Sequence, residues 1–345
     1  MNVIEPVGGG KRETYLDILR FLATFAVIVE HVAAEGYRMH QIDTNGWYMA
    51  VVADSLVRWC VPVFVMISGA LFLNPQKVIS TNGIITKYVR RLFIAYCFWY
   101  IAYVCMYITI ESIKAHALVI NGDFFKPQFH LWFLPMLMGV YLLVPLLRVI
   151  ASSKKLLKYS IVLWLIYITV SFCIEWEIPQ FSKLFVMNIV IGYTGYYLLG
   201  YYLSCIDYKR KYLYIICFLG IIGMFVKTIG NIFLSVKYGI PDNKFLFELG
   251  PHVVLTATSV FVILKSIAID NNKYNKKFLY FIDNNRKDLF GVYLIHGVWL
   301  YLFIRYYDLS TPLVTIPILS LLIYLFSVFT SKLMRKSRLL KIVVE

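Results

Sequence analysis

Two ionisable side chains, Arg20 and His31, stand within the first hydrophobic stretch of the chain. Ionisable groups are costly in the hydrocarbon of a membrane, so such a pair inside an apolar helix is by default a candidate functional site. Eleven residues at about 100° each return to nearly the same helix face. The helical rise places the two positions roughly 16 Å apart along the axis. One face would therefore carry a fixed cation near the helix start and, deeper inside, an imidazole able to exchange protons near neutral pH.

A second interpretation of this stretch is purely structural. Asp17 precedes Arg20 by three residues, a spacing at which the two side chains can pair on a helix. A buried Asp17–Arg20 pair that only fixes helix packing, with His31 hydrogen-bonded to a neighbour, is equally consistent with these residues.

Composition predicts a membrane protein. Of 345 residues, 60% are hydrophobic and only 15% are charged. The formal net charge of +15 comes from short basic clusters between hydrophobic stretches, which is typical of the positive-inside rule and argues against nucleic-acid binding. The cysteines form no CxxC pair and no metal-ligand spacing with histidine, so we expect neither disulfides, a metal site nor a permanently bound cofactor.

Hydrophobic stretches long enough to cross a bilayer predict an all-α, polytopic membrane bundle in a single domain over residues 1–345. No separate soluble domain fits in the loops, and the first stretch lacks a signal-peptide cleavage site. We expect about ten spans, at residues 14–36, 47–73, 88–111, 131–151, 156–175, 184–205, 211–236, 249–269, 287–306 and 312–333.

The distribution of positive charge predicts the orientation. One set of loops and ends holds 23 lysines and arginines, and the opposite set holds 7. The positive-inside rule then places both termini in the cytoplasm, as an even number of spans requires. We therefore expect a multi-pass protein of the inner (cytoplasmic) membrane.

A basic cluster marks the cytoplasmic start of the third predicted span. Lys87, Arg90 and Arg91 are three to four residues apart, so at least two share a helix face near the membrane surface. Such a cluster suits a phosphate group. Ordinary anchoring by positive charge is the alternative interpretation of the same residues.

Further polar side chains fall within or beside other predicted spans. His130 and Trp132 stand at the expected outer rim of the fourth span, and His296 follows Tyr293 inside the ninth. A tryptophan there is usually an anchor, whereas a neighbouring histidine could bind a sugar or an acyl acceptor.

The second predicted span contains a possible internal ion pair. Asp54 and Arg58 are four residues apart, and they precede the segment from Pro62 to Gly69. Proline and small residues within a span permit a bend and close helix contact.

Together these motifs resemble the acyltransferase 3 family of bacterial integral-membrane O-acyltransferases, over essentially the whole chain. The matching elements are Arg20 and His31 with ten residues between them, Lys87…Arg90-Arg91, Pro62-Val-Phe-Val-Met-Ile-Ser-Gly69, His130-Leu-Trp-Phe and Tyr293-Leu-Ile-His296. The chain is similar to the stand-alone branch, which lacks the C-terminal SGNH hydrolase-like domain of longer members.

This resemblance implies a ten-helix core that moves an acyl group, usually acetyl, from cytoplasmic acyl-CoA to a hydroxyl of a surface glycan. It implies that Arg20 and His31 are the catalytic pair and that Arg90, with Lys87, belongs to the basic motif. The family usually has arginine at the position of Lys87, where lysine keeps the charge but loses a bidentate guanidinium.

The residues fit this chemistry. A thioester is already activated, so the reaction needs a base for the acceptor hydroxyl and exclusion of water. His31 could take the proton or could itself be acylated, and sequence leaves both routes open. Arg20, nearer the cytoplasm, is better placed to hold the donor than to contact His31.

Two other classes of function use the same features. A polysaccharide exporter or flippase would line its path with buried charges, but the sequence lacks paired broken helices and clear inverted repeats. A non-catalytic membrane scaffold would not need His31 and His296. An acyl-transfer assay separates all three classes.

Overall fold

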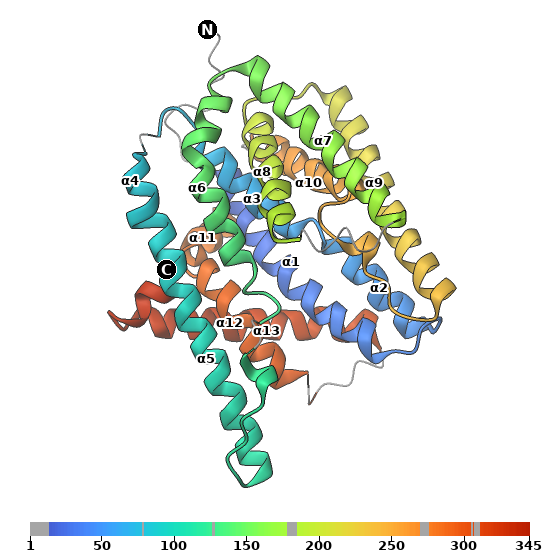
Figure 1. Ribbon diagram of the computed structural model, residues 1–345, viewed down its shortest axis with the longest axis vertical. Helices are drawn as coiled ribbons and strands as arrows, with labels where there is room; N and C mark the ends of the chain where they lie inside the picture. The colour runs from blue at the N-terminus through green and yellow to red at the C-terminus, as the bar shows by residue number, and fades with distance from the viewer. Residues whose placement is uncertain are drawn as a thin grey trace.

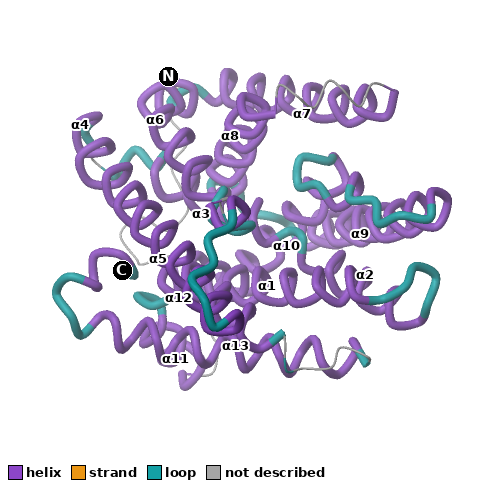
Figure 2. Tube along the Cα trace, turned by 60° about the horizontal axis from the view of Figure 1, so that its bottom comes forward, coloured by secondary structure: helices purple, strands orange, loops and turns teal. Residues whose placement is uncertain are grey.

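The computed structural model describes residues 14–77, 79–125, 128–177, 185–269, 276–304, 306 and 311–345. These residues form a bundle of helices without a β-strand (Figures 1 and 2). The helices are α1 (Thr14–Met39), α2 (Asn45–Val57), α3 (Cys60–Phe72), α4 (Thr81–Gly83), α5 (Arg90–Ala115), α6 (Phe133–Ala151), α7 (Lys154–Glu177), α8 (Phe185–Ser204), α9 (Arg210–Tyr238), α10 (Pro251–Ile269), α11 (Lys276–Asn285), α12 (Leu289–Phe303) and α13 (Pro312–Arg335), with a π-helix η1 (Ile84–Val89) and 3-10 turns η2 (Gly122–Phe125), η4 (Lys244–Leu246) and η5 (Leu340–Val343).

The bundle has the composition of a membrane protein. Among the described residues, seven helical segments are long and apolar enough to cross a bilayer. Large apolar side chains such as Phe218, Phe225 and Phe329 are exposed on its outer surface, where lipid would cover them. The predicted all-α membrane bundle is confirmed, whereas the number of ten spans and the cytoplasmic location of the termini stay predictions.

Each predicted span overlaps a helix, but three of these helices, α1, α8 and α12, fall outside the seven segments. For α1 and α12 the reason is visible. The first, α1, carries several charged residues along its length, among them Asp17, Arg20 and Glu30. The helix α12 has 15 residues, fewer than the predicted range 287–306. It starts beside Asp288, which is buried and pairs with Arg335 at 3.3 Å.

The second predicted span is broken rather than continuous. α2 ends at Val57 and α3 begins at Cys60, with Arg58 and Trp59 in the turn between them. Pro62 has no N–H to donate to the carbonyl of Arg58, and its ring crowds that carbonyl. The break leaves Arg58 in the middle of the span.

The third predicted span begins earlier than expected. The helix starts at Thr81, where the Ser80 hydroxyl caps the N–H of Gly83 at 3.0 Å. It continues through the π-helical turn η1 into α5. The predicted basic cluster therefore lies inside a long helical segment, with Lys87 in η1 and Arg90 at the start of α5.

Glycines allow α3 and α8 to pack with their backbones in contact. A β-carbon at Gly69 would come within 1.8 Å of the carbonyl oxygen of Tyr197, and one at Gly200 within 2.2 Å of that of Met66. The close helix contact expected at Gly69 is thus confirmed.

The helix α1 is central to the bundle. It packs against α2, α3, α10, α12 and α13, and most of its apolar side chains are buried. Because α1 carries both Arg20 and His31, this packing fixes the backbone positions of the two candidate residues.

Candidate active site

The helix α1 lines two cavities that lie toward its opposite ends. Arg20 and Thr24 line the first cavity, of about 460 Å³, which we call the Arg20 cavity. His31 lines the second, of about 450 Å³, which we call the His31 cavity. Other residues of α1 as far as Arg38 also line it. The two predicted residues therefore face different cavities rather than each other.

Three histidines from three elements meet beside the His31 cavity. The ring of His31, on α1, lies 5.3 Å from that of His296, on α12, with only 12° between the planes. The ring of His130, just before α6, lies 4.7 Å from that of His296. The sequence placed His130 at the outer rim, but its side chain is buried within this cluster.

A hydrogen bond identifies the donating nitrogen of His296. Its Nδ1 lies 2.5 Å from the carbonyl oxygen of Tyr293. A carbonyl only accepts hydrogen bonds, so Nδ1 is the donor of this pair, and in a neutral ring Nε2 would keep its lone pair. This Nε2, like both ring nitrogens of His130, has no hydrogen-bond partner among the described residues. The cluster thus presents uncommitted ring nitrogens next to His31.

Gly297 makes room for the histidine cluster. A β-carbon there would come within 2.6 Å of Cε1 of His130 and 2.7 Å of the hydroxyl of Tyr103. That hydroxyl donates to the carbonyl of Leu294 at 2.8 Å, so it has little freedom to move away. Sequence reasoning missed Gly297, although it directly follows His296.

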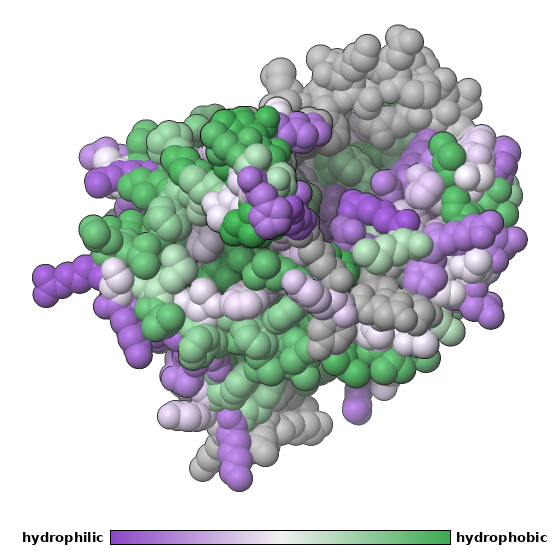
Figure 3. Space-filling view, turned by 90° about the horizontal axis from the view of Figure 1, so that it is seen from below, coloured by the Kyte–Doolittle hydropathy of each residue, from purple (hydrophilic) through white to green (hydrophobic). Residues whose placement is uncertain are grey.

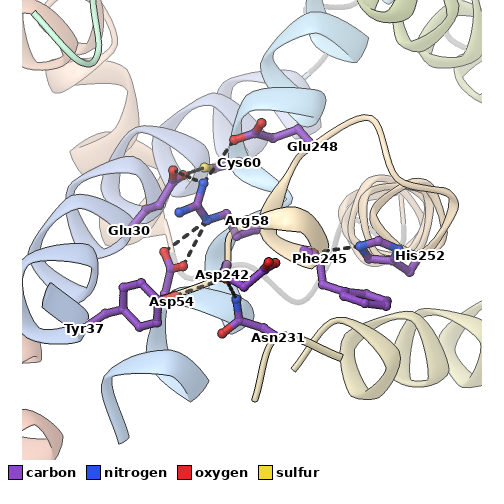
Figure 4. A network of polar contacts seen from close by, with 10 residues as sticks. All are labelled: Glu30, Tyr37, Asp54, Arg58, Cys60, Asn231, Asp242, Phe245, Glu248 and His252. Atoms are coloured by element: carbon purple, nitrogen blue, oxygen red, sulfur yellow. Dashed lines mark hydrogen bonds and ion pairs between the residues drawn. The ribbon is translucent and has the colours of Figure 1, made fainter. Parts of the chain in front are cut away.

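Arg58 organises a buried group of carboxylates at the same cavity (Figure 4). Its Nε lies 3.1 Å from both carboxylate oxygens of Asp54, which confirms the expected internal pair. Its Nη1 lies 3.1 Å from Glu30 and 3.3 Å from Glu248. The Cys60 thiol donates to the other oxygen of Glu30 at 2.9 Å.

Glu30 and Glu248 are not among the site residues predicted from the sequence. Glu30 could have been noticed as a carboxylate in an apolar helix beside His31. Glu248 lies 190 residues from Arg58, in a loop, and no local pattern predicts that contact. Three carboxylates surround one guanidinium, so the group offers hydrogen-bond acceptors to hydroxyl donors, whereas the charge of Arg58 is already paired.

Aromatic rings complete the wall of the His31 cavity. Phe129 lies edge-on to His31 at 4.5 Å, and Trp132 and Tyr193 line the cavity with their rings 5.7 Å apart. Aromatic faces beside carboxylates suit a ligand with both apolar and hydroxyl-bearing surfaces. Figure 3 shows the molecule from below relative to Figure 1. Hydrophilic side chains lie there beside a hollow near the middle of the visible face.

The Arg20 cavity is lined by the other candidate catalytic residue of α1. The Nη1 of Arg20 lies 3.3 Å from the Asp17 carboxylate, so the predicted pair forms, but the Arg20 side chain keeps 32% exposure. Arg91 and Tyr141 line the same cavity. A guanidinium with one carboxylate partner and an open side can still bind an anion.

The basic cluster lines a third cavity, of about 480 Å³, which we call the basic cleft. Lys87, Arg90 and Arg91 meet there with Lys341, from the C-terminal turn η5. The cleft shares Arg91 and Glu345 with the Arg20 cavity, so the two are neighbours. Lys341 was not predicted, because its position depends on how the C-terminal turn packs.

The electrostatics of this end favour an anion. Lys77, in the loop after α3, is partly buried, and its burial lowers its pKa below the ordinary value of a lysine. The positive charges of Arg20, Lys87 and Arg148 lower that pKa further. A bound anion would relieve this repulsion.

The predicted site residues thus fall into three places. Arg20, to which Asp17 is paired, lies at the Arg20 cavity. Lys87, Arg90 and Arg91 lie at the basic cleft, and His31, Arg58, His130, Trp132 and His296 lie in or beside the His31 cavity. Over the described part of the chain, no group of three or more His, Cys, Asp or Glu side chains could hold a metal ion.

Comparison with known proteins identifies one relationship. The family model Acyl_transf_3, described as an acyltransferase domain, matches residues 13–332. No curated protein and no solved structure matches the chain.

Proposed function

Because the chain belongs to the acyltransferase 3 family and is a membrane acyltransferase, we propose that it moves an acetyl group from cytoplasmic acyl-CoA to a glycan. The acceptor is a hydroxyl of a cell-surface or lipid-linked saccharide, and the protein resides in the inner membrane. One observation carries the proposal: three neighbouring cavities with shared wall residues lie in a series from the basic cluster to the buried histidines.

Shared residues connect these cavities in order. The basic cleft and the Arg20 cavity share Arg91, and the Arg20 cavity and the His31 cavity share Phe133 and Tyr293. A donor with a charged head and a long, thin arm fits such a series. The CoA phosphates bind Lys87, Arg90 and Arg91, the pantetheine arm passes Arg20, and the thioester reaches His31.

In the chemical step, the acceptor hydroxyl oxygen attacks the thioester carbonyl carbon. His31 takes the hydroxyl proton, the new C–O bond forms, and the C–S bond breaks. The proton then passes to the departing CoA sulfur, so the products are an ester and CoA thiol. His296 and His130 support the imidazole of His31, while Arg58 and Trp132 bind the acceptor side.

The test is an acyl-transfer assay on purified protein in proteoliposomes. Labelled acetyl-CoA is supplied together with a lipid-linked saccharide extract of the host membrane. We expect label in the saccharide fraction and an equal amount of released CoA. Movement of saccharide across the membrane without CoA release would support an exporter instead. If neither saccharide movement nor CoA release is observed, the result would support a non-catalytic scaffold.

A further inference from the structure

The Arg20 cavity and the His31 cavity meet at a pair of aromatic rings. Phe133, the first residue of α6, and Tyr293, on α12, line both cavities. Their ring centroids are 5.5 Å apart, and the planes are inclined by 60°. The two residues are only 9% and 7% exposed, so the rings fill the junction.

Both cavities offer polar groups to water, which makes the junction important. Arg20 and Ser68 line one cavity, and Glu30, Asp54 and Arg58 line the other. The cavities also lie toward opposite ends of α1. If the cavities open toward opposite faces of the membrane, a wet connection between them would let protons and ions cross the bilayer unless the protein blocks it.

From this geometry we infer that Phe133 and Tyr293 are the permeability barrier of the protein, and that the donor arm crosses between them by displacing Phe133. The barrier rests on the shared wall of the two cavities and on their opening toward opposite membrane faces, whereas the crossing by the donor arm rests on the proposed function. A constriction of apolar rings excludes water because a narrow apolar passage dewets. The same exclusion would protect the thioester from hydrolysis.

The two rings are fixed to different degrees. The Tyr293 hydroxyl donates to the backbone carbonyl of His130, and the Tyr293 carbonyl accepts from His296. The Phe133 side chain can form no hydrogen bond, and its neighbours include the rings of Phe64, 6.1 Å away, and Trp132. Tyr293 is therefore the fixed side of the barrier and Phe133 the movable side.

The experiment measures proton leak in proteoliposomes that contain a trapped pH-sensitive dye. Wild-type vesicles should be tight. Phe133→Ala removes the movable ring, and we expect the leak per protein to rise at least tenfold. Two matched controls remove a phenyl ring from one cavity only: Phe247→Ala at the His31 cavity and Phe290→Ala at the Arg20 cavity. Both controls should stay tight.

Further variants separate loss of the barrier from loss of the fold. Phe133→Leu keeps an apolar side chain at the junction and should restore most of the tightness. Thermal unfolding of each variant in detergent identifies misfolded protein. A folded Phe133→Ala variant as tight as wild type would overturn the proposal, and so would equal leaks in all three alanine variants.

A final arm tests the donor route. A non-hydrolysable thioether analogue of acetyl-CoA, added to the leaking variant, should reduce the leak because its arm occupies the junction. If the variant leaks and the analogue has no effect, the barrier stands but the donor does not cross there. The leak assay needs no acyl transfer, so failure of the proposed activity gives a separate result.

Discussion

The imidazoles of His31 and His296 lie nearly parallel, 5.3 Å apart, although 265 positions separate them in the sequence. The Nδ1 of His296 donates to the Tyr293 carbonyl, and its Nε2 has no hydrogen-bond partner among the described residues. His31 therefore has a second imidazole beside it and a third, His130, beyond. This arrangement suits a base that must accept a proton and release it within each turnover.

We predict that His31→Ala abolishes acyl transfer while the protein still inserts and folds. General-base catalysis typically contributes about 10² to 10⁴-fold to a rate, so the loss should be at least of that order. Acylation of the saccharide fraction is the measurement, and thermal unfolding checks the fold. His116→Ala, at an exposed loop position, is the matched control. Normal transfer by a stable His31→Ala variant would remove His31 from the mechanism.

The basic cleft gives a prediction about donor affinity. Lys87→Gln combined with Arg90→Gln removes two of its positive charges, and we expect weaker binding of acetyl-CoA by calorimetry. The loss should be largest at low salt, because salt already screens partly exposed charges. Lys154→Gln with Lys155→Gln, at exposed positions on α7, removes the same charge elsewhere. Equal affinities of the two double variants for acetyl-CoA would show that the cluster does not bind the donor and only sets the orientation of the helix in the membrane.

The sequence predicted those parts of the site that differ in chemistry from their surroundings. Arg20, His31 and His296 are polar residues in apolar stretches, and such residues are visible without any knowledge of the fold. The structure brings His130 to the same cluster. Helix positions were also predictable, because a span needs a long apolar stretch.

Contacts between distant segments could not be predicted. Glu248 reaches Arg58 only because the loop before α10 packs beside the break between α2 and α3. Lys341 joins the basic cleft only because η5 folds back beside α5. Such placements depend on the packing of whole helices, for which a single sequence contains no local signal.

The Arg58 group gives a prediction about stability. Arg58→Met would remove the guanidinium that pairs with three buried carboxylates. Removing one partner of a buried ion pair typically costs about 3–5 kcal/mol, so we expect a loss of this order in the free energy of unfolding. Arg38→Met breaks the pair with Glu35, whose arginine is 63% exposed, and should cost much less.

The matching measurement is unfolding in detergent. Glu248→Gln should destabilise less than Arg58→Met, because it removes one of three negative charges that surround a single positive charge. If Arg58→Met and Arg38→Met cost the same, the carboxylates around Arg58 are not charged in the folded protein.

The last prediction concerns sidedness, on which the two-ended site depends. The basic loops predict that the loop after α5 faces outward and that the start of α7 faces the cytoplasm. Single cysteines at Gly122 and Lys155, in a background without the native cysteines, report on these two places. Gly122 has open space around it, and Lys155 is exposed, so both thiols should react freely.

A thiol reagent that cannot cross the membrane, added to cells with a permeabilised outer envelope, should label position 122 and spare position 155. Disruption of the membrane should then allow both to react. The opposite pattern would place the basic cleft outside the cell, where cytoplasmic acyl-CoA cannot reach it, and the proposed direction of transfer would be wrong.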